Sequence, residues 1–184
     1  MLPLTSNLSF LVKPKNLLSQ AIDNRTYFSV DQVAKFIVSE DSTIQVIDVR
    51  SPEEFRTMSI PGSINVPYHE LLDNDPGANI DRKKTYCIFY SNGDFDSNFA
   101  FTIARGLNYQ NTYVMRGGLN EWFSTIMNSS FTGDRISARE NAVFETRTRA
   151  RKMFTEINSL PDSLKMKFIR LKRSTAIKLD GGCE

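Results

Sequence analysis

Short apolar runs and helix-like periodic stretches alternate along the first two thirds of the chain. The apolar runs predict strands at residues 44–49, 86–90 and 112–115, and a short edge-like strand ended by proline at residues 64–67. Helices are expected to begin near Ser29, Ser51, Asn98 and Gly117. Strands that alternate with helices predict a parallel sheet covered on both faces, which is a three-layer α/β domain.

The pattern changes at both ends of the chain. Residues 1–27 are interpreted as an N-terminal leader, and residues 28–131 as the α/β domain. Residues 132–184 are predicted to form an antiparallel helical hairpin that ends in the tail Gly181-Gly182-Cys183-Glu184. Each helix of the hairpin has an apolar stripe at helical spacing: Val143, Ala150, Phe154 and Ile157 in the first, Leu164, Phe168, Leu171 and Thr175 in the second.

The charges divide the chain in the same place. The hydrophobic share of 40% and the charged share of 24% are those of a globular protein. Residues 1–131 hold 11 Lys/Arg and 14 Asp/Glu, a net charge of −3, whereas residues 132–184 hold 12 and 7, a net charge of +5. The net charge of +2 therefore combines a near-neutral domain with a basic C-terminal segment.

The two cysteines, Cys87 and Cys183, provide neither a disulfide framework nor the spacing of a metal site, so we expect no metal and no cofactor. Both are expected to stay reduced, which indicates a cytoplasmic or cytoplasmic-facing protein. No apolar run is long enough for a membrane span. An anchor upstream of Met1, in a longer native chain, stays open.

A cluster of turn-forming residues follows the strand predicted at 86–90. A strand, a tight loop and a helix N-terminus together form a cradle of backbone N–H groups suited to an anion or a thiolate. The carboxylates of the loop disfavour an anion, and no basic residue offsets them. The predicted binding loop consists of Ser91, Asn92, Gly93, Asp94, Phe95, Asp96 and Ser97.

Several motifs in order resemble the rhodanese-like family over roughly residues 28–126. They are Asp48-Val49-Arg50, Glu54-Phe55, the segment Ile60-Pro61-Gly62-Ser63-Ile64-Asn65-Val66-Pro67, and Gly117-Gly118 with Trp122. The resemblance implies a five-stranded parallel sheet. It also implies sulfur transfer through a cysteine persulfide at the head of a six-residue loop.

The sequence departs from this family at the position of the nucleophile. Counting back from Gly117-Gly118 without gaps places Ser91 at the cysteine position, and matching Gly93 to the family glycine places Tyr90 there. Neither register supplies a cysteine, so no catalytic residue is expected at this loop. Met58-Ser59 replaces the usual Gly-His, a change interpreted as structural, and Arg50 and Glu54 are expected to form an ion pair.

The remaining nucleophiles have simpler interpretations. Ser91 would need a positioned base, and nothing in the sequence directs His69, the only histidine, toward the loop. Cys87 lies within a strand and is interpreted as an inert core thiol. Cys183 is a possible thiol acceptor on a Gly-Gly tether, although Glu184 beside it opposes thiolate formation.

The favoured hypothesis is a rhodanese-like domain without sulfurtransferase activity that acts as a binding or regulatory module with a protein partner. Self-association through the C-terminal helices is a further expectation. The alternative is a sulfurtransferase or sulfur carrier that uses Cys183 or Cys87. The basic C-terminal helices could also meet an anionic surface, whereas their charges lack the interleaved aromatic residues of a nucleic-acid site, so no nucleic acid is expected.

Overall fold

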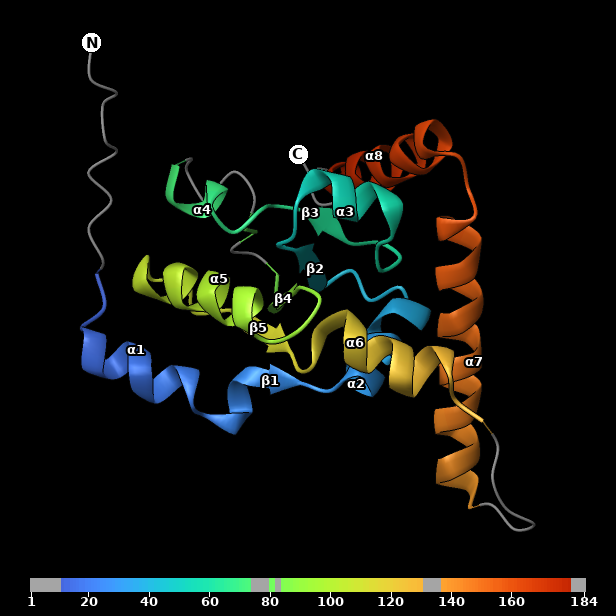
Figure 1. Cartoon of the computed structure of the whole chain (residues 1–184), viewed down its shortest axis with the longest axis horizontal. Coiled ribbons are helices and arrows are strands. Elements are labelled where there is room, and N and C mark those ends of the chain that lie inside the picture. The colour runs from blue at the N-terminus through green and yellow to red at the C-terminus, as the bar shows by residue number, and fades with distance from the viewer. Residues whose placement is uncertain (1–10, 74–79, 82–83, 131–136, 180–184) are drawn as a thin grey trace.

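The computed structural model describes residues 11–73, 80–81, 84–130 and 137–179. Its centre is a five-stranded parallel sheet in the order β1-β5-β4-β2-β3 (Figure 1). The predicted three-layer α/β class and the five parallel strands are confirmed. The strands are β1 (Tyr27–Phe28), β2 (Ile44–Asp48), β3 (Ile64–Asn65), β4 (Tyr86–Tyr90) and β5 (Thr112–Met115).

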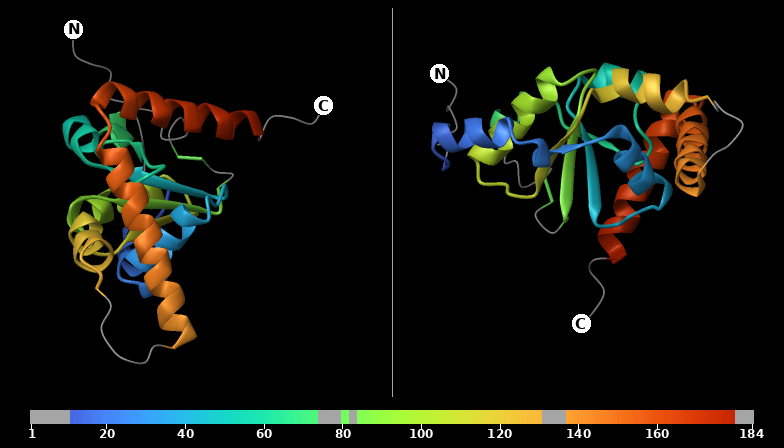
Figure 2. Two further views of the ribbon diagram at one scale, coloured as in Figure 1. Left: turned by 90° about the vertical axis from the view of Figure 1, so that its right-hand side faces the viewer. Right: turned by 90° about the horizontal axis from the view of Figure 1, so that it is seen from below.

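Helices cover both faces of the sheet (Figures 1 and 2). The N-terminal elements are α1 (Pro14–Ala21), η1 (Asn24–Thr26) and α2 (Val30–Val38). Around the sheet follow α3 (Pro52–Thr57), α4 (Glu70–Asp73), α5 (Phe95–Gly106), α6 (Gly118–Trp122) and the π-helical turn η3 (Phe123–Met127). The C-terminal helices are α7 (Ala138–Asn158) and α8 (Asp162–Leu179). Of these described helices, none combines the length and the apolar content that crossing a bilayer demands.

Strand β4 shows why the central strands are apolar throughout. Alternate side chains of a strand point to opposite faces of the sheet. Cys87 and Phe89 enter the apolar cluster beneath α5, whereas Ile88 and Tyr90 enter the cluster beneath α2, α6 and α7. Because helices cover both faces, every position of this strand from Cys87 onward is buried.

Helix starts follow local chemistry that the sequence contains. Ser29, Ser51 and Ser137 each accept a hydrogen bond from the backbone N–H three residues later, and a Gln or Glu at that position caps the serine in return. These reciprocal bonds satisfy donors that a helix N-terminus leaves unpaired. The helices predicted near Ser29 and Ser51 therefore begin where expected.

Part of the predicted leader belongs to the sheet. Tyr27 pairs with Val114 in β1, which forms one edge of the sheet beside β5. The Tyr27 hydroxyl lies 2.7 Å from Asn98 Oδ1 and 3.0 Å from the Ala21 carbonyl oxygen, which joins α1 to α5. A strand of two residues is too short to produce an alternating pattern, so the sequence did not reveal it.

Both expected C-terminal helices are present, but they meet at an open angle instead of lying along each other (Figures 1 and 2). Helix α7 packs against α2 and η3, and α8 packs against α3. Arg147 of α7 donates to both carboxylate oxygens of Asp31, at 2.7 and 2.6 Å. Each C-terminal helix is thus fixed by the α/β domain.

Lys165 holds α8 on α3 from a buried position. Its side chain is 1% exposed and donates to the carbonyl oxygens of Phe55 and Arg56 and to Asn158 Oδ1, at 3.2, 2.8 and 2.7 Å. The two carbonyls belong to the last turn of α3, where the helix leaves acceptors unpaired and favours a cation. Burial lowers the pKa of Lys165 to about 8.

We expect this pKa to give Lys165 a contribution to the stability of the fold that grows with pH in the alkaline range. In the unfolded chain a lysine titrates near about 10.4. Between about pH 8 and that value the unfolded state holds a proton that the folded state has lost, so the contribution of Lys165 to the free energy of unfolding increases with pH. Urea titrations of wild type and Lys165→Met from pH 7 to pH 10 test this. The difference between the two free energies should change across the window, and parallel curves would contradict the assignment.

Lys152→Met is the matched control, because Lys152 is an exposed lysine of α7. Its stability should run parallel to that of wild type over the same range.

Candidate functional site

The candidate site is the loop between β4 and α5, at the carboxyl edge of the sheet. Ser91 directly follows β4, and α5 begins at Phe95 rather than at Asn98 as expected. The predicted start of this helix at Asn98 is therefore wrong by three residues, and Phe95, Asp96 and Ser97 lie on the helix. The Ser97 hydroxyl contacts the carbonyl oxygens of Gly93 and Asp94, at 3.2 and 3.1 Å.

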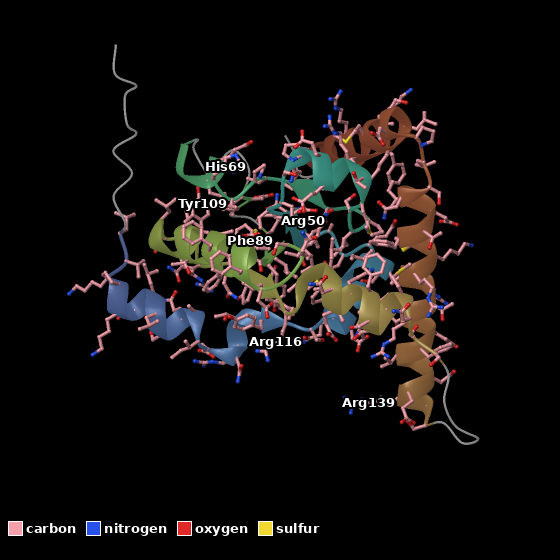
Figure 3. All side chains as sticks on the ribbon, viewed as in Figure 1. Arg50, His69, Phe89, Tyr109, Arg116 and Arg139 are labelled. Carbon is pink, nitrogen blue, oxygen red and sulfur yellow. The ribbon has the colours of Figure 1, made fainter. Side chains whose placement is uncertain are left out.

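The Ser91 hydroxyl is directed into its own loop. The residue is 1% exposed, and its Oγ donates to the carbonyl oxygen of Gly93 at 2.7 Å. Within the described residues, no basic side chain bonds to this oxygen. His69 instead lies beside α4, apart from Arg50 at the sheet edge, with its ring against Tyr68 (Figure 3). A serine nucleophile therefore lacks the base that it needs.

The loop is fastened to the start of α6. The backbone N–H of Leu119 donates to the carbonyl oxygen of Ser91 at 2.9 Å, and Asp94 Oδ1 accepts from the N–H of Gly117 at 2.6 Å. Gly118 has a φ of +56°, and a Cβ there would lie 2.4 Å from the Ser91 carbonyl oxygen. Only glycine allows this approach, which explains the Gly117-Gly118 motif physically.

Asn92 bridges the loop to two charged side chains. Its Nδ2 donates to Glu54 Oε1 at 2.8 Å, and its Oδ1 accepts from Arg50 Nη1 at 3.1 Å. The bond from Asn92 lowers the pKa of Glu54. The sequence identified Asn92 only as a loop residue, because its partners lie 38 and 42 positions earlier.

The expected ion pair between Arg50 and Glu54 is wrong. Arg50 pairs with Asp48, with Nη2 2.6 Å from Oδ2 and Nε 3.0 Å from Oδ1, and both side chains are buried. Burial alone would lower the pKa of Arg50, but the bonds to Asp48 outweigh burial and raise it. The pair was expected to hold the strand to the helix that follows it, whereas the actual partner, Asp48, lies two residues before Arg50 at the end of β2.

The same arginine also reaches the segment before Ile60. Arg50 Nη2 donates to the Met58 carbonyl oxygen at 2.6 Å. On the other side, Asn158 of α7 accepts from the N–H of Ser59 and donates to its carbonyl oxygen, both at 2.9 Å. The Met58-Ser59 segment is therefore a structural junction between the loop network and the C-terminal helices.

The polar groups around the loop offer an anion little attraction. The charge of Arg50 is matched by Asp48, and Arg116 lies over the Tyr27 ring at 4.7 Å while it bonds to Asn24. Acidic residues occupy the first turns of all three helices that follow β2, β4 and β5, namely Glu53, Glu54, Asp96 and Glu121. Carboxylates at this edge repel an anion and oppose formation of a thiolate.

Cys87 has the surroundings of a core thiol. Its sulfur lies 3.3 Å from the Asp81 carbonyl oxygen and 3.4 Å from Gln45 Oε1, and Asn111 Nδ2 donates to it at 3.3 Å. Burial raises the pKa of this thiol to about 12, so it stays protonated at neutral pH. Cys183, the other candidate, lies outside the described residues.

Exposed aromatic side chains line the surface beside the loop. Phe95 is 85% exposed at the start of α5, and Phe99 one turn later is also exposed. Tyr68 packs edge-on against Phe99, with ring centroids 5.6 Å apart. The sequence named Phe95 but missed Tyr68 and Phe99. The spacing of four between the two phenylalanines was the available signal for a shared helix face.

Comparison with known proteins finds sulfurtransferases among the relatives of this chain. The chain is 28% identical over 116 residues to a thiosulfate:glutathione sulfurtransferase of Saccharomyces cerevisiae, across 58% of this chain and 84% of that protein. A mitochondrial thiosulfate sulfurtransferase of the same yeast is 24% identical over 111 residues, across 53% and 72%. A crystal structure of a Bacillus halodurans protein superposes with a TM-score of 0.50 at 18% identity, across 71% and 99%, which shows a shared fold.

The family comparison covers four of the five strands and the candidate loop. A family model described as the rhodanese-like domain matches residues 29–125. This range holds 97 of the 184 residues, more than half of the chain. It includes β2, β3, β4, β5 and the glycine motif that fastens the loop to α6. The chain therefore belongs to the rhodanese-like domain family.

Proposed function

We propose that this rhodanese-like domain does not transfer sulfur at its β4–α5 loop and acts instead as a binding module through the same edge of the sheet. The observation that carries the proposal is the Ser91 hydroxyl, buried and bonded to the Gly93 carbonyl oxygen at 2.7 Å. A hydroxyl in this position is neither a thiol nor open to a substrate.

Sulfur transfer through a persulfide needs a thiolate and a positive environment. Serine stands at the head of the loop, and the helices that follow β2, β4 and β5 carry acidic residues in their first turns. Cys87 cannot replace the missing thiolate, since its pKa of about 12 keeps it protonated and its side chain is buried. The chain thus keeps the fold of its sulfurtransferase relatives without the nucleophile.

A binding role is supported by what the loop edge presents. Phe95 and Phe99 expose large aromatic surface beside the carboxylate of Asp96. Exposed aromatic side chains with polar neighbours are typical of protein interfaces. A protein partner at this edge fits these residues.

Thiosulfate:cyanide sulfurtransferase turnover tests the proposal on wild type and Ser91→Cys. We expect no turnover from either protein. A thiol at residue 91 would face the Gly93 carbonyl oxygen and nearby carboxylates, which favour its protonated form. Turnover by wild type would overturn the proposal. Turnover by Ser91→Cys alone would show that the loop still forms an anion cradle, and it would contradict its use for another ligand.

The alternative, in which the chain carries sulfur on a cysteine, is tested by a separate experiment. Wild type, Cys183→Ser and Cys87→Ser are incubated with thiosulfate and analysed for persulfide by intact-mass spectrometry. A persulfide that disappears in Cys183→Ser would place sulfur chemistry on the tail and favour the carrier over the binding module.

A further inference from the structure

Helix α8 presents an apolar stripe to solvent. Its large apolar side chains recur at spacings of four, four and three, so they share one face. Each is between 37% and 56% exposed: Leu160, just before the helix, then Leu164, Phe168 and Leu171. An amphipathic helix in a globular domain usually buries such a stripe.

The orientation of α8 is fixed by its charged face instead. Lys165 points inward and caps α3 through two carbonyl oxygens. Leu164 and Phe168 lie on the flank of the helix beside Lys165, one position before it and three after it. Their side chains stay in solvent, at 52% and 42% exposed. In two views α8 lies at an edge of the molecule, outside the other described elements (Figures 1 and 2).

The charge of α8 indicates which kind of partner surface would suit the stripe. The helix has one acidic residue, Asp162, against six basic ones: Lys165, Lys167, Arg170, Lys172, Arg173 and Lys178. Lys167 and Arg170 lie along one flank of the stripe, and with Ser163, Met166 and Leu171 they line an open groove. Paired α8 helices of two copies would bring these like charges together, which disfavours self-association.

We propose that α8 docks lengthwise on an anionic lipid bilayer surface. Leu164 and Phe168 enter the boundary between headgroups and acyl chains, and Lys167 and Arg170 meet lipid phosphates. An apolar stripe flanked by long basic side chains has the chemistry of an interfacial helix. This role does not depend on the loop at Ser91, so the binding proposal and the docking proposal stand or fall separately.

Vesicle co-sedimentation of the full chain tests the proposal. We expect binding to phosphatidylcholine vesicles that contain phosphatidylserine and none to phosphatidylcholine alone. Binding should fall steeply from about 50 to about 300 mM salt, as screening shortens the range of the attraction. Lys167→Gln/Arg170→Gln should weaken it on the order of 25-fold, since each basic side chain at an anionic surface contributes about fivefold.

Two matched variants separate a docking face from net charge. Arg139→Gln/Arg149→Gln removes two exposed charges from α7 and should weaken binding far less. Leu164→Ser/Phe168→Ser keeps every charge and should abolish insertion, with circular dichroism as the check on folding. Equal losses from the two charge variants, or no binding to anionic vesicles at low salt, would overturn the proposal. A wild-type dimer in sedimentation velocity that is absent in Leu164→Ser/Phe168→Ser would also overturn it, because the stripe would then be a contact between two copies.

Discussion

Arg50→Met should lower the free energy of unfolding by about 3–5 kcal/mol, because it leaves the buried carboxylate of Asp48 without its partner. The substitution also removes the bonds from Arg50 to Asn92 and to the Met58 carbonyl oxygen. The loop, the end of β2 and the segment after α3 share this one guanidinium. Urea unfolding at pH 7, followed by circular dichroism, measures the loss.

Two variants show whether the loss comes from the buried pair. Arg56→Met breaks an exposed pair with Glu53 and should cost less than about 1 kcal/mol. Asp48→Asn/Arg50→Met removes both charges and should recover part of the stability that Arg50→Met loses, since no lone charge stays buried. A loss from Arg50→Met as small as that from Arg56→Met would contradict the role of Arg50 as the centre of the network.

The sequence predicts elements whose stabilisation is local. Strand β4 is apolar along its length, and Ser29, Ser51 and Ser137 carry capping boxes within four residues. Tertiary contacts are not needed to recognise these features. The α/β class was predicted for this reason, whereas the five-stranded sheet was predicted through family resemblance.

The errors arise where a partner is distant in the sequence or where packing overrides periodicity. Arg50 pairs with Asp48 because both side chains are buried at the end of β2, and the sequence pattern alone does not show this burial. The true start of α5 at Phe95 leaves the large side chain of Phe95 in solvent, so the apolar pattern gave no signal for it.

Helix α8 shows most clearly that the packing of a helix can differ from what its apolar pattern predicts. Its apolar stripe of Leu164, Phe168 and Leu171 was predicted as one face of a hairpin helix, and the structure leaves these side chains exposed. Lys165 takes the buried position because the end of α3 offers it carbonyl acceptors. Sequence periodicity identifies a helix and its apolar face, and only the acceptors on the partner element decide which face is buried.

Phe154→Ala should destabilise the whole chain by about 3–5 kcal/mol, the cost of a large cavity in a packed core. Phe154 is buried between Trp122 and Phe123, with ring centroids 6.1 and 5.6 Å away. These residues belong to α6 and η3, so the cavity would open at the junction of α7 with the α/β domain. Differential scanning calorimetry should show one transition, shifted down by roughly 10 °C.

The single transition is the decisive part of this prediction. Arg147 pairs with Asp31, and Asn158 bonds to Ser59 in both directions, so α7 is attached to the domain along much of its length. Phe95→Ala is the matched control and should cost less than about 0.5 kcal/mol, because its ring is exposed. If Phe154→Ala instead produced a second, earlier transition and left the main one in place, α7 would be an appendage. The rhodanese-like domain would then be complete without it, and the bonds from Asn158 to Ser59 would not couple the C-terminal helices to the loop network.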